Sequence, residues 1–246
     1  MKKSIAIALF LTLTILFTTS GSAEWVLYDD FDSYTDISDL DPNKWLIRDR
    51  VDMNDPGSKQ IAIFSIEGGR LRIKHLKKVP GISAWATLIH KPDKIKGISA
   101  RMEVQKWEHE VRARIGADIG FLEDDPDHFF WYQFAFQRRP EDILNKGSIF
   151  GALSVLDSSN NYEWLWDSVY SQFGYPVEPV LDESYELTGT FTVKKFSYKV
   201  DDWGTSVNKY PDKIVRITDP FRGIGTISFD KDGTCVIYID DVYVLR

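Results

Sequence analysis

The chain has 246 residues, of which 43% are hydrophobic and 27% charged, and its formal net charge is −7. This composition is typical of a globular protein and excludes collagen-like, disordered and coiled-coil chains. The excess of acidic residues argues against nucleic acid and anionic membranes as partners, because phosphate binding needs clustered positive charge.

The N-terminus has the pattern of a secretory signal peptide. Lys2 and Lys3 precede an apolar run at residues 5–17, and small residues follow up to Ala23. A membrane-spanning helix needs about 20 apolar residues. We therefore predict that residues 1–23 are a cleaved signal peptide, with an uncleaved anchor as the alternative. The mature protein is expected to be exported to the periplasm or the extracellular space, with no membrane insertion after cleavage.

The rest of the chain is predicted to form short β-strands. Apolar and polar residues alternate with period two, and Gly and Pro fall between the runs. The runs cover Trp25–Phe31, Ile61–Ile66, Leu71–Leu76, Ile82–Ile89, Ile98–Trp107, Arg112–Phe121, Phe129–Gln137, Ser148–Leu156, Tyr162–Trp166, Leu187–Val200, Gly223–Phe229 and Thr234–Leu245. Gly-containing turns predict two hairpins, one at residues 67–69 and one at residues 230–233.

Strands without a linker or a break in composition indicate a single all-β domain over residues 24–246, a sandwich or a barrel. The one cysteine, Cys235, excludes an internal disulfide and is expected to be buried and inert. Asp167–Tyr185 is the longest stretch without a pattern, so we expect a loop there, and its length makes it a functional candidate. The domain is expected to be a monomer.

Four motifs give the chain a family resemblance. They are Leu27-Tyr28-Asp29-Asp30-Phe31, Leu40-Asp41-Pro42-Asn43-Lys44-Trp45, Ile66-Glu67-Gly68-Gly69-Arg70-Leu71 and Ile239-Asp240-Asp241-Val242-Tyr243-Val244. In this order they resemble the concanavalin A-like lectin/glucanase superfamily. The resemblance implies a jelly-roll sandwich of two curved antiparallel sheets whose first and last strands pair. It also implies a concave sheet on which extended glycans lie, although function carried over from a fold is analogy.

Three consecutive runs, between residues 98 and 137, each have one polar side. If these strands are neighbours, as sequential strands usually are, their polar sides form one surface. Sugars offer hydroxyl groups to hydrogen-bond and an apolar ring face to stack on an aromatic side chain. We predict a glycan-binding surface made of Trp131, Gln133, Gln137, Arg101, Glu103, Arg112, Arg114 and Asp118. The alternative is a solvated sheet face crossed by ion pairs.

The sequence favours binding over catalysis. Glucanases of the superfamily carry a strand motif of Glu, a hydrophobe, Asp, two residues and Glu, and here Gln105 replaces the Asp between Glu103 and Glu108. We therefore predict an exported, non-catalytic glycan-binding domain whose partner is a polysaccharide. A glycoside hydrolase with a non-standard carboxylate pair and a passive cell-envelope module remain the alternatives.

No cofactor is required by the sequence, but a structural calcium ion is a candidate. Jelly-roll modules similar to this one often bind a structural Ca²⁺ ion where the first and last strands meet. Asp30 and Asp240 lie in the matching segments, and carboxylate oxygens suit this hard cation. The alternative is that these residues only mark the strand edges.

Overall fold

The computed structural model describes residues 23–76, 80–108, 111–123, 125–138, 148–156, 162–170, 179–192, 196–207, 214–215, 217–229 and 233–246. The predicted signal peptide lies outside these residues except for Ala23, as do residues 171–178 of the predicted loop. Within the described part, no helix has the length and apolar character needed to span a membrane.

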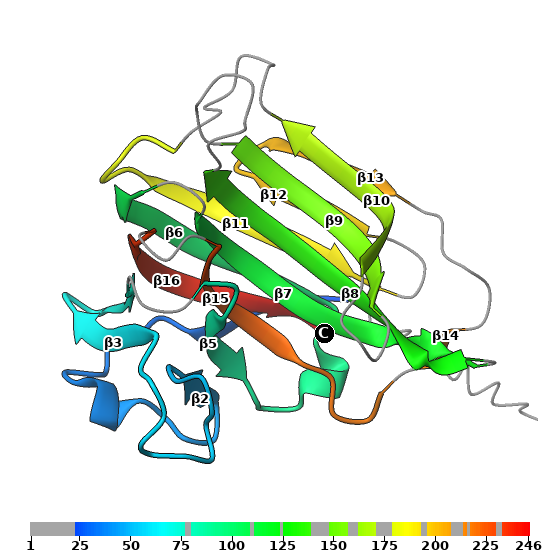
Figure 1. Cartoon of the computed structure of the whole chain (residues 1–246). Helices are drawn as coiled ribbons and strands as arrows, with labels where there is room; N and C mark the ends of the chain where they lie inside the picture. Colours follow the sequence, from blue (N-terminus) through cyan, green and yellow to red (C-terminus); the bar gives the residue numbers. More distant parts are fainter. Residues whose placement is uncertain are drawn as a thin grey trace, which may run out of the picture.

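The described strands form two antiparallel sheets, drawn one behind the other in Figure 1. Sheet A runs in the order β13 (Trp203–Val207), β12 (Phe196–Val200), β11 (Ser184–Phe191), β6 (Gly97–Trp107), β16 (Cys235–Leu245), β4 (Arg70–His75), β3 (Ala62–Glu67), and β1 (Trp25–Asp29) also pairs with β16. Sheet B runs in the order β10 (Tyr162–Tyr170), β9 (Ser148–Leu156), β8 (Asp125–Arg138), β7 (Val111–Leu122), β15 (Arg222–Ser228), β5 (Ser83–Leu88), β2 (Trp45–Arg48), and β14 (Ile214–Val215) also pairs with β7. Two short 3₁₀ turns, η1 (Ile37–Asp39) and η2 (Pro92–Lys94), complete the described elements. The predicted all-β, two-sheet antiparallel jelly-roll sandwich is confirmed.

The core between the sheets is made of the apolar sides of the alternating strands. The residues of β6, β7 and β8 that point inward are buried, and they are Ile98, Ala100, Met102, Val104, Ala113, Ile115, Ala117, Ile119, Phe130, Tyr132, Phe134 and Phe136. Cys235 is also buried, and burial raises the pKa of its thiol well above the ordinary value. This environment leaves the thiol protonated and unreactive.

Some of the predicted connections differ from those in the structure. The turn at Gly68 and Gly69 does join β3 to β4, with φ of 61° and 72° at the two glycines. The second predicted hairpin is wrong, because β15 belongs to sheet B and β16 to sheet A; its residues 230–232 lie outside the described part. The single run predicted at Leu187–Val200 is two antiparallel strands, β11 and β12, that pair with each other.

A buried carboxylate joins the first strand to β2 and to the segment before it. Asp29 Oδ2 accepts hydrogen bonds from Trp45 Nε1 at 2.8 Å and from the Tyr34 hydroxyl at 3.0 Å, and Lys44 Nζ lies 3.5 Å from it. The Phe31 N–H donates to Oδ1 at 3.2 Å. Two of the motifs that carry the family resemblance are therefore joined by one side chain.

We expect Asp29→Ala to lower the free energy of unfolding by about 3 kcal/mol or more. The substitution leaves the buried Trp45 N–H without its acceptor and removes the partner of Lys44. Urea denaturation followed by tryptophan fluorescence measures the change. Asp30→Ala is the control, because within the described part of the chain Asp30 accepts one long hydrogen bond, of 3.3 Å from the Asp32 N–H. The cost of this substitution should stay below about 1 kcal/mol. Equal losses in the two variants would contradict this account.

A buried histidine connects the sheets. His75, on β4, is fully buried, and its Nδ1 lies 3.0 Å from the Thr226 hydroxyl on β15. Burial, and then the charge of Arg114, lowers the pKa of His75 to about 4. The ring is therefore neutral in the folded protein at neutral pH.

Because the pKa of His75 lies below that of an unfolded histidine, the unfolded chain binds the extra proton first as the pH falls. The stability that His75 contributes is complete above about pH 6.5 and is lost as the pH drops toward 4. We expect a loss of about 2 kcal/mol between pH 7 and pH 4.5. The measurement is chemical denaturation of the wild type and of His75→Gln at both pH values. Parallel pH dependence in the two proteins would show that His75 has no such role.

Candidate functional site

The outer face of sheet B carries six of the eight side chains predicted to bind a ligand. On β7 and β8, Arg112 lies opposite Gln137, Asp118 lies opposite Trp131, and Gln133 lies opposite Gly116. Arg114 has the same parity on β7 and lies opposite Gly225 of β15. Their inward neighbours fill the core, so these side chains share one face.

Arg101 and Glu103 do not belong to this face, so the prediction of one surface from three strands is wrong. Their strand, β6, pairs with β11 and β16 in sheet A rather than with β7. Glu103 Oε2 accepts a hydrogen bond from Arg70 Nη1 at 2.5 Å, and Arg101 Nη1 lies 3.0 Å from Asp241 Oδ2. Glu103 and Asp118 therefore lie on opposite faces of the sandwich and cannot act as a carboxylate pair.

The arginines and glutamines form a buried layer instead of the open contacts that we predicted. Arg112 donates to Gln137 Oε1 at 3.1 Å and to Gln133 Oε1 at 3.2 Å. Arg114 donates to the same Gln133 oxygen at 3.1 Å and to the Ser83 hydroxyl. Both arginines are 7% exposed and both glutamines 2% exposed. In this structure the four side chains are buried and hydrogen-bond to one another.

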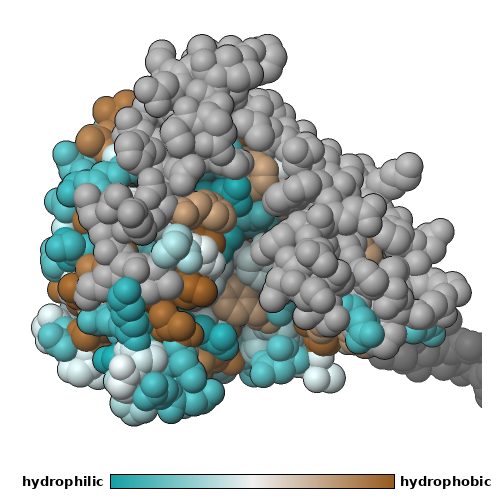
Figure 2. All heavy atoms as spheres, in the orientation of Figure 1, coloured by the Kyte–Doolittle hydropathy of each residue, from teal (hydrophilic) through white to brown (hydrophobic). Residues whose placement is uncertain are grey.

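Aromatic rings contact both guanidinium groups. Arg112 lies 4.6 Å from the ring centre of Phe150 and 4.8 Å from that of Phe229, and Arg114 lies 4.6 Å from that of Trp85. A planar guanidinium group stacks favourably on the face of an aromatic ring. This stacking explains how the two positive charges are accommodated among apolar groups. Figure 2 shows hydrophobic and hydrophilic side chains side by side near the centre of the view.

Trp131 belongs to a cluster of three aromatic side chains next to the arginines. Its ring centre lies 6.1 Å from that of Trp85 and 5.6 Å from that of Phe221, and Trp85 and Phe221 are 5.0 Å apart. A Cβ at Gly116 would lie only 2.7 Å from Trp131 and 2.8 Å from Trp85. Gly116 therefore lets the two indoles meet over the sheet. Trp131 itself is half-buried, outside the core.

Asp118 lies at the same end of the face. Its Oδ2 accepts a hydrogen bond from the Phe221 N–H at 3.2 Å, and its own N–H donates to the Phe221 carbonyl at 3.0 Å. Burial raises the pKa of the Asp118 carboxyl above its ordinary value, although the Phe221 N–H, Arg222 and Arg48 act in the opposite direction. Asp118 is thus a carboxyl group that holds its proton to higher pH than usual.

Arg222 fixes the backbone around Asp118. It is buried, and it donates to the carbonyl oxygens of Ile95 at 3.1 Å, of Phe221 at 2.7 Å and of Asp118. Arg222, Phe221 and Arg48 were not predicted from the sequence to be site residues. Arg48 projects from the edge strand β2 with its guanidinium 5.8 Å from the Phe221 ring centre.

The predicted calcium ligands are not gathered into a cluster. Asp30 Oδ1 accepts from the Asp32 N–H, and Asp240 Oδ1 accepts from the Asp241 N–H. Among the residues that the structure describes, no group of three or more His, Cys, Asp or Glu side chains is placed to hold a metal ion. Asp30 follows β1 and Asp240 lies on β16, so each of these two hydrogen bonds is local.

Comparisons with known proteins identify the fold. No protein-family model and no curated protein matches the chain, whereas solved structures match over most of its length. One belongs to work on endo-acting O-glycanases of human gut bacteria that initiate mucin breakdown, at 15% identity, covering 88% of this chain and 97% of that one with a TM-score of 0.56. Another is the catalytic domain of an endo-1,3-β-glucanase (laminarinase) from Thermotoga petrophila, at 12% identity, 92% and 99% coverage and a TM-score of 0.57. A third is alginate lyase A1-II′ of polysaccharide lyase family 7, at 10% identity, 83% and 95% coverage and a TM-score of 0.54. At these identities the matches show a shared jelly-roll fold, which is consistent with the concanavalin A-like resemblance.

These matches contradict the prediction that favoured binding over catalysis. That prediction depended on the replacement of one residue in one glucanase motif, at Gln105. The matched structures are glycan-degrading hydrolases and lyases. Gln105 lies on β6 of sheet A, so its identity says nothing about the chemistry on the outer face of sheet B.

Gly116→Ala tests the contact between the two tryptophans. The added methyl group would overlap both indoles, so we expect a loss of about 1–3 kcal/mol in stability and a clear change in the near-ultraviolet circular dichroism of the tryptophans. Gly68→Ala is the comparison: it has open space around it and a φ of 61°, so it should lower stability through backbone strain and leave the near-ultraviolet spectrum unchanged. An unchanged spectrum in Gly116→Ala would contradict the cluster.

Proposed function

We propose that this protein is an exported enzyme that cleaves a glycan chain lying on the outer face of sheet B. The observation that carries the proposal is the placement of Asp118, a carboxyl with a raised pKa, directly opposite the half-buried Trp131. The fold shared with glycan-degrading hydrolases and lyases supports it.

Asp118 is suited to donate a proton. Hydrolysis and β-elimination of a glycosidic bond both require protonation of the leaving oxygen. A carboxyl whose pKa is raised by burial stays protonated closer to neutral pH than an exposed aspartate does. The hydrogen bond from the Phe221 N–H and the backbone clamp by Arg222 hold this carboxyl in one place, as a group aimed at one oxygen must be.

Trp131 and Phe221 provide the surface on which a sugar ring rests. The ring faces of sugars are apolar, and a half-buried indole with a neighbouring phenyl ring matches them. Arg48, exposed beside Phe221, adds a positive charge at the open edge. Arg112 and Arg114 lie in the layer beneath. The exposed guanidinium of Arg48 favours a glycan that carries carboxylate or sulfate groups.

Asp118→Asn should lower kcat by a factor of about 10² to 10⁴ without unfolding the protein, because the amide keeps an oxygen for the Phe221 N–H but has no acidic proton to give. Wild-type activity should fall as the pH rises through the raised pKa of Asp118. Trp131→Ala should instead raise KM about tenfold, since it removes only the stacking surface. The assays use alginate, mucin O-glycans and laminarin as substrates.

The matched control is Asp127→Asn, which makes the same substitution at an exposed carboxylate on β8 and should leave kcat unchanged. Product analysis separates the two reaction classes, because elimination gives an unsaturated uronate and hydrolysis gives a saturated reducing end. Full activity in Asp118→Asn on a cleaved substrate would disprove the role of Asp118. No cleavage of any of the three substrates by the wild type would count against the proposed function.

A further inference from the structure

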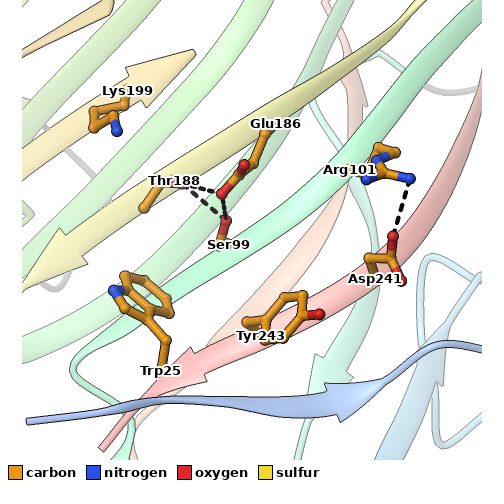
Figure 3. A pocket seen from close by; sticks show the side chains of 8 residues that line it. All are labelled: Trp25, Ser99, Arg101, Glu186, Thr188, Lys199, Asp241 and Tyr243. Atoms are coloured by element: carbon orange, nitrogen blue, oxygen red, sulfur yellow. Dashed lines mark hydrogen bonds and ion pairs between the residues drawn. The ribbon is translucent and has the colours of Figure 1, made fainter. Parts of the chain in front are cut away.

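The outer face of sheet A, on the opposite side of the sandwich, contains a hollow of about 480 Å³. Five strands, β1, β6, β11, β12 and β16, contribute to its lining. The lining side chains, shown in Figure 3, are Trp25, Ser99, Arg101, Glu186, Thr188, Lys199, Asp241 and Tyr243. Its volume falls in the range of sites for small ligands, about 300–1,000 Å³.

The cross-strand register explains why the sheet is hollowed here. One row of directly opposed residues crosses four strands, and it consists of Lys199, Thr188, Ser99 and Tyr243. The two central members, Thr188 and Ser99, have short side chains, and the two outer members have long ones. Short side chains between long ones leave a depression in an otherwise even face.

A bulge in β16 completes the wall. The register with β6 shifts between Asp240 and Tyr243, and Asp241 has a φ of 45°. A bulge of this kind re-aims the side chains that follow it. Val242 and Val244 are consequently buried, whereas Tyr243 is 38% exposed over the hollow, close to Trp25 at 36%.

Hydrogen bonds and an ion pair connect most polar groups of the lining, and the charges of the lining balance. Glu186 Oε1 accepts hydrogen bonds from the Ser99 hydroxyl at 2.9 Å and the Thr188 hydroxyl at 3.3 Å. Arg101 is fixed by its ion pair with Asp241 at 3.0 Å. The lining contains two cationic and two acidic side chains, so it offers no net attraction to a charged ligand.

We propose that this hollow is a second binding site, which takes an uncharged saccharide. Carboxylates, a guanidinium group and hydroxyl groups pair with sugar hydroxyls in both hydrogen-bonding directions. Trp25 and Tyr243 offer rings for the apolar sugar face. The balanced charge of the lining distinguishes this site from the arginine-bearing face of sheet B. The inference does not depend on the proposed function, since it concerns residues on the other side of the core.

Affinity electrophoresis of the full chain in gels that contain galactomannan or arabinogalactan tests the proposal, with alginate as the charged comparison. The wild type should be retarded by at least one neutral polysaccharide. Tyr243→Ala, which removes a ring, and Thr188→Arg, which fills the hollow, should each weaken that apparent affinity about tenfold or more. Circular dichroism and thermal unfolding establish that both variants are folded.

Ile63→Ala is the matched control, because Ile63 is an exposed apolar residue of β3 in the same sheet that does not line the hollow, and Trp131→Ala is the control for sheet B. Both should bind neutral polysaccharide like the wild type. Absence of retardation in every neutral gel would overturn the proposal. It would also be overturned if Trp131→Ala abolished the retardation while Tyr243→Ala did not, or if alginate alone bound at the hollow. Because Tyr243→Ala should keep the kcat of the wild type on a short substrate, failure here is distinct from failure of the proposed enzyme.

Discussion

The assignment of β6 and β7 to different sheets is the constraint on which the functional surfaces depend. The two strands follow each other in the chain, yet β6 pairs with β11 and β16 while β7 pairs with β8 and β15. Their apolar sides, at residues such as Met102 and Ile115, fill the same core, and so their polar sides point in opposite directions. Packed sheets lie about 10 Å apart. Polar residues of β6 and β7 therefore contribute to two surfaces that no single sugar ring can bridge.

The fold class and the core could be predicted from the sequence because burial leaves a local signal. Alternation with period two identified the inward residues of β6, β7 and β8, and the glycine pair at residues 68–69 identified a turn whose backbone only glycine adopts readily. Strand pairing leaves no such signal. Leu187 of β11 lies opposite Ala100 of β6, and nothing near either residue specifies that partner. The short strands β2 and β14 contain too few residues for any alternation to be recognised.

The candidate site was predicted only in part, again because contacts between distant segments leave no local signal in the sequence. The outward direction of Trp131, Asp118 and Gln133 follows from their own strands, but their burial depends on distant segments. Gln133 is covered in a layer with Arg112, whose guanidinium is enclosed by Phe150 of β9 and by Phe229. Phe221, which supplies the N–H to Asp118, precedes β15 by one residue and has no distinguishing sequence pattern. The chemistry of Asp118 is therefore a property of the assembled face.

The arginines of sheet B and the charge-balanced lining of the sheet A hollow belong to one acidic chain. The net charge of −7 gives no indication that Arg48, Arg112 and Arg114 gather on sheet B, or that the lining of the sheet A hollow is balanced. Because the core separates the faces, a polymer held at Tyr243 would reach Asp118 only by passing around the rim of the sandwich. If both proposals hold, attachment at the hollow would raise the local concentration of substrate at Asp118 only for chains long and flexible enough to make that turn. The two proposals together then predict a preference for long glycans, with neutral stretches and acidic stretches in one chain, over short oligosaccharides.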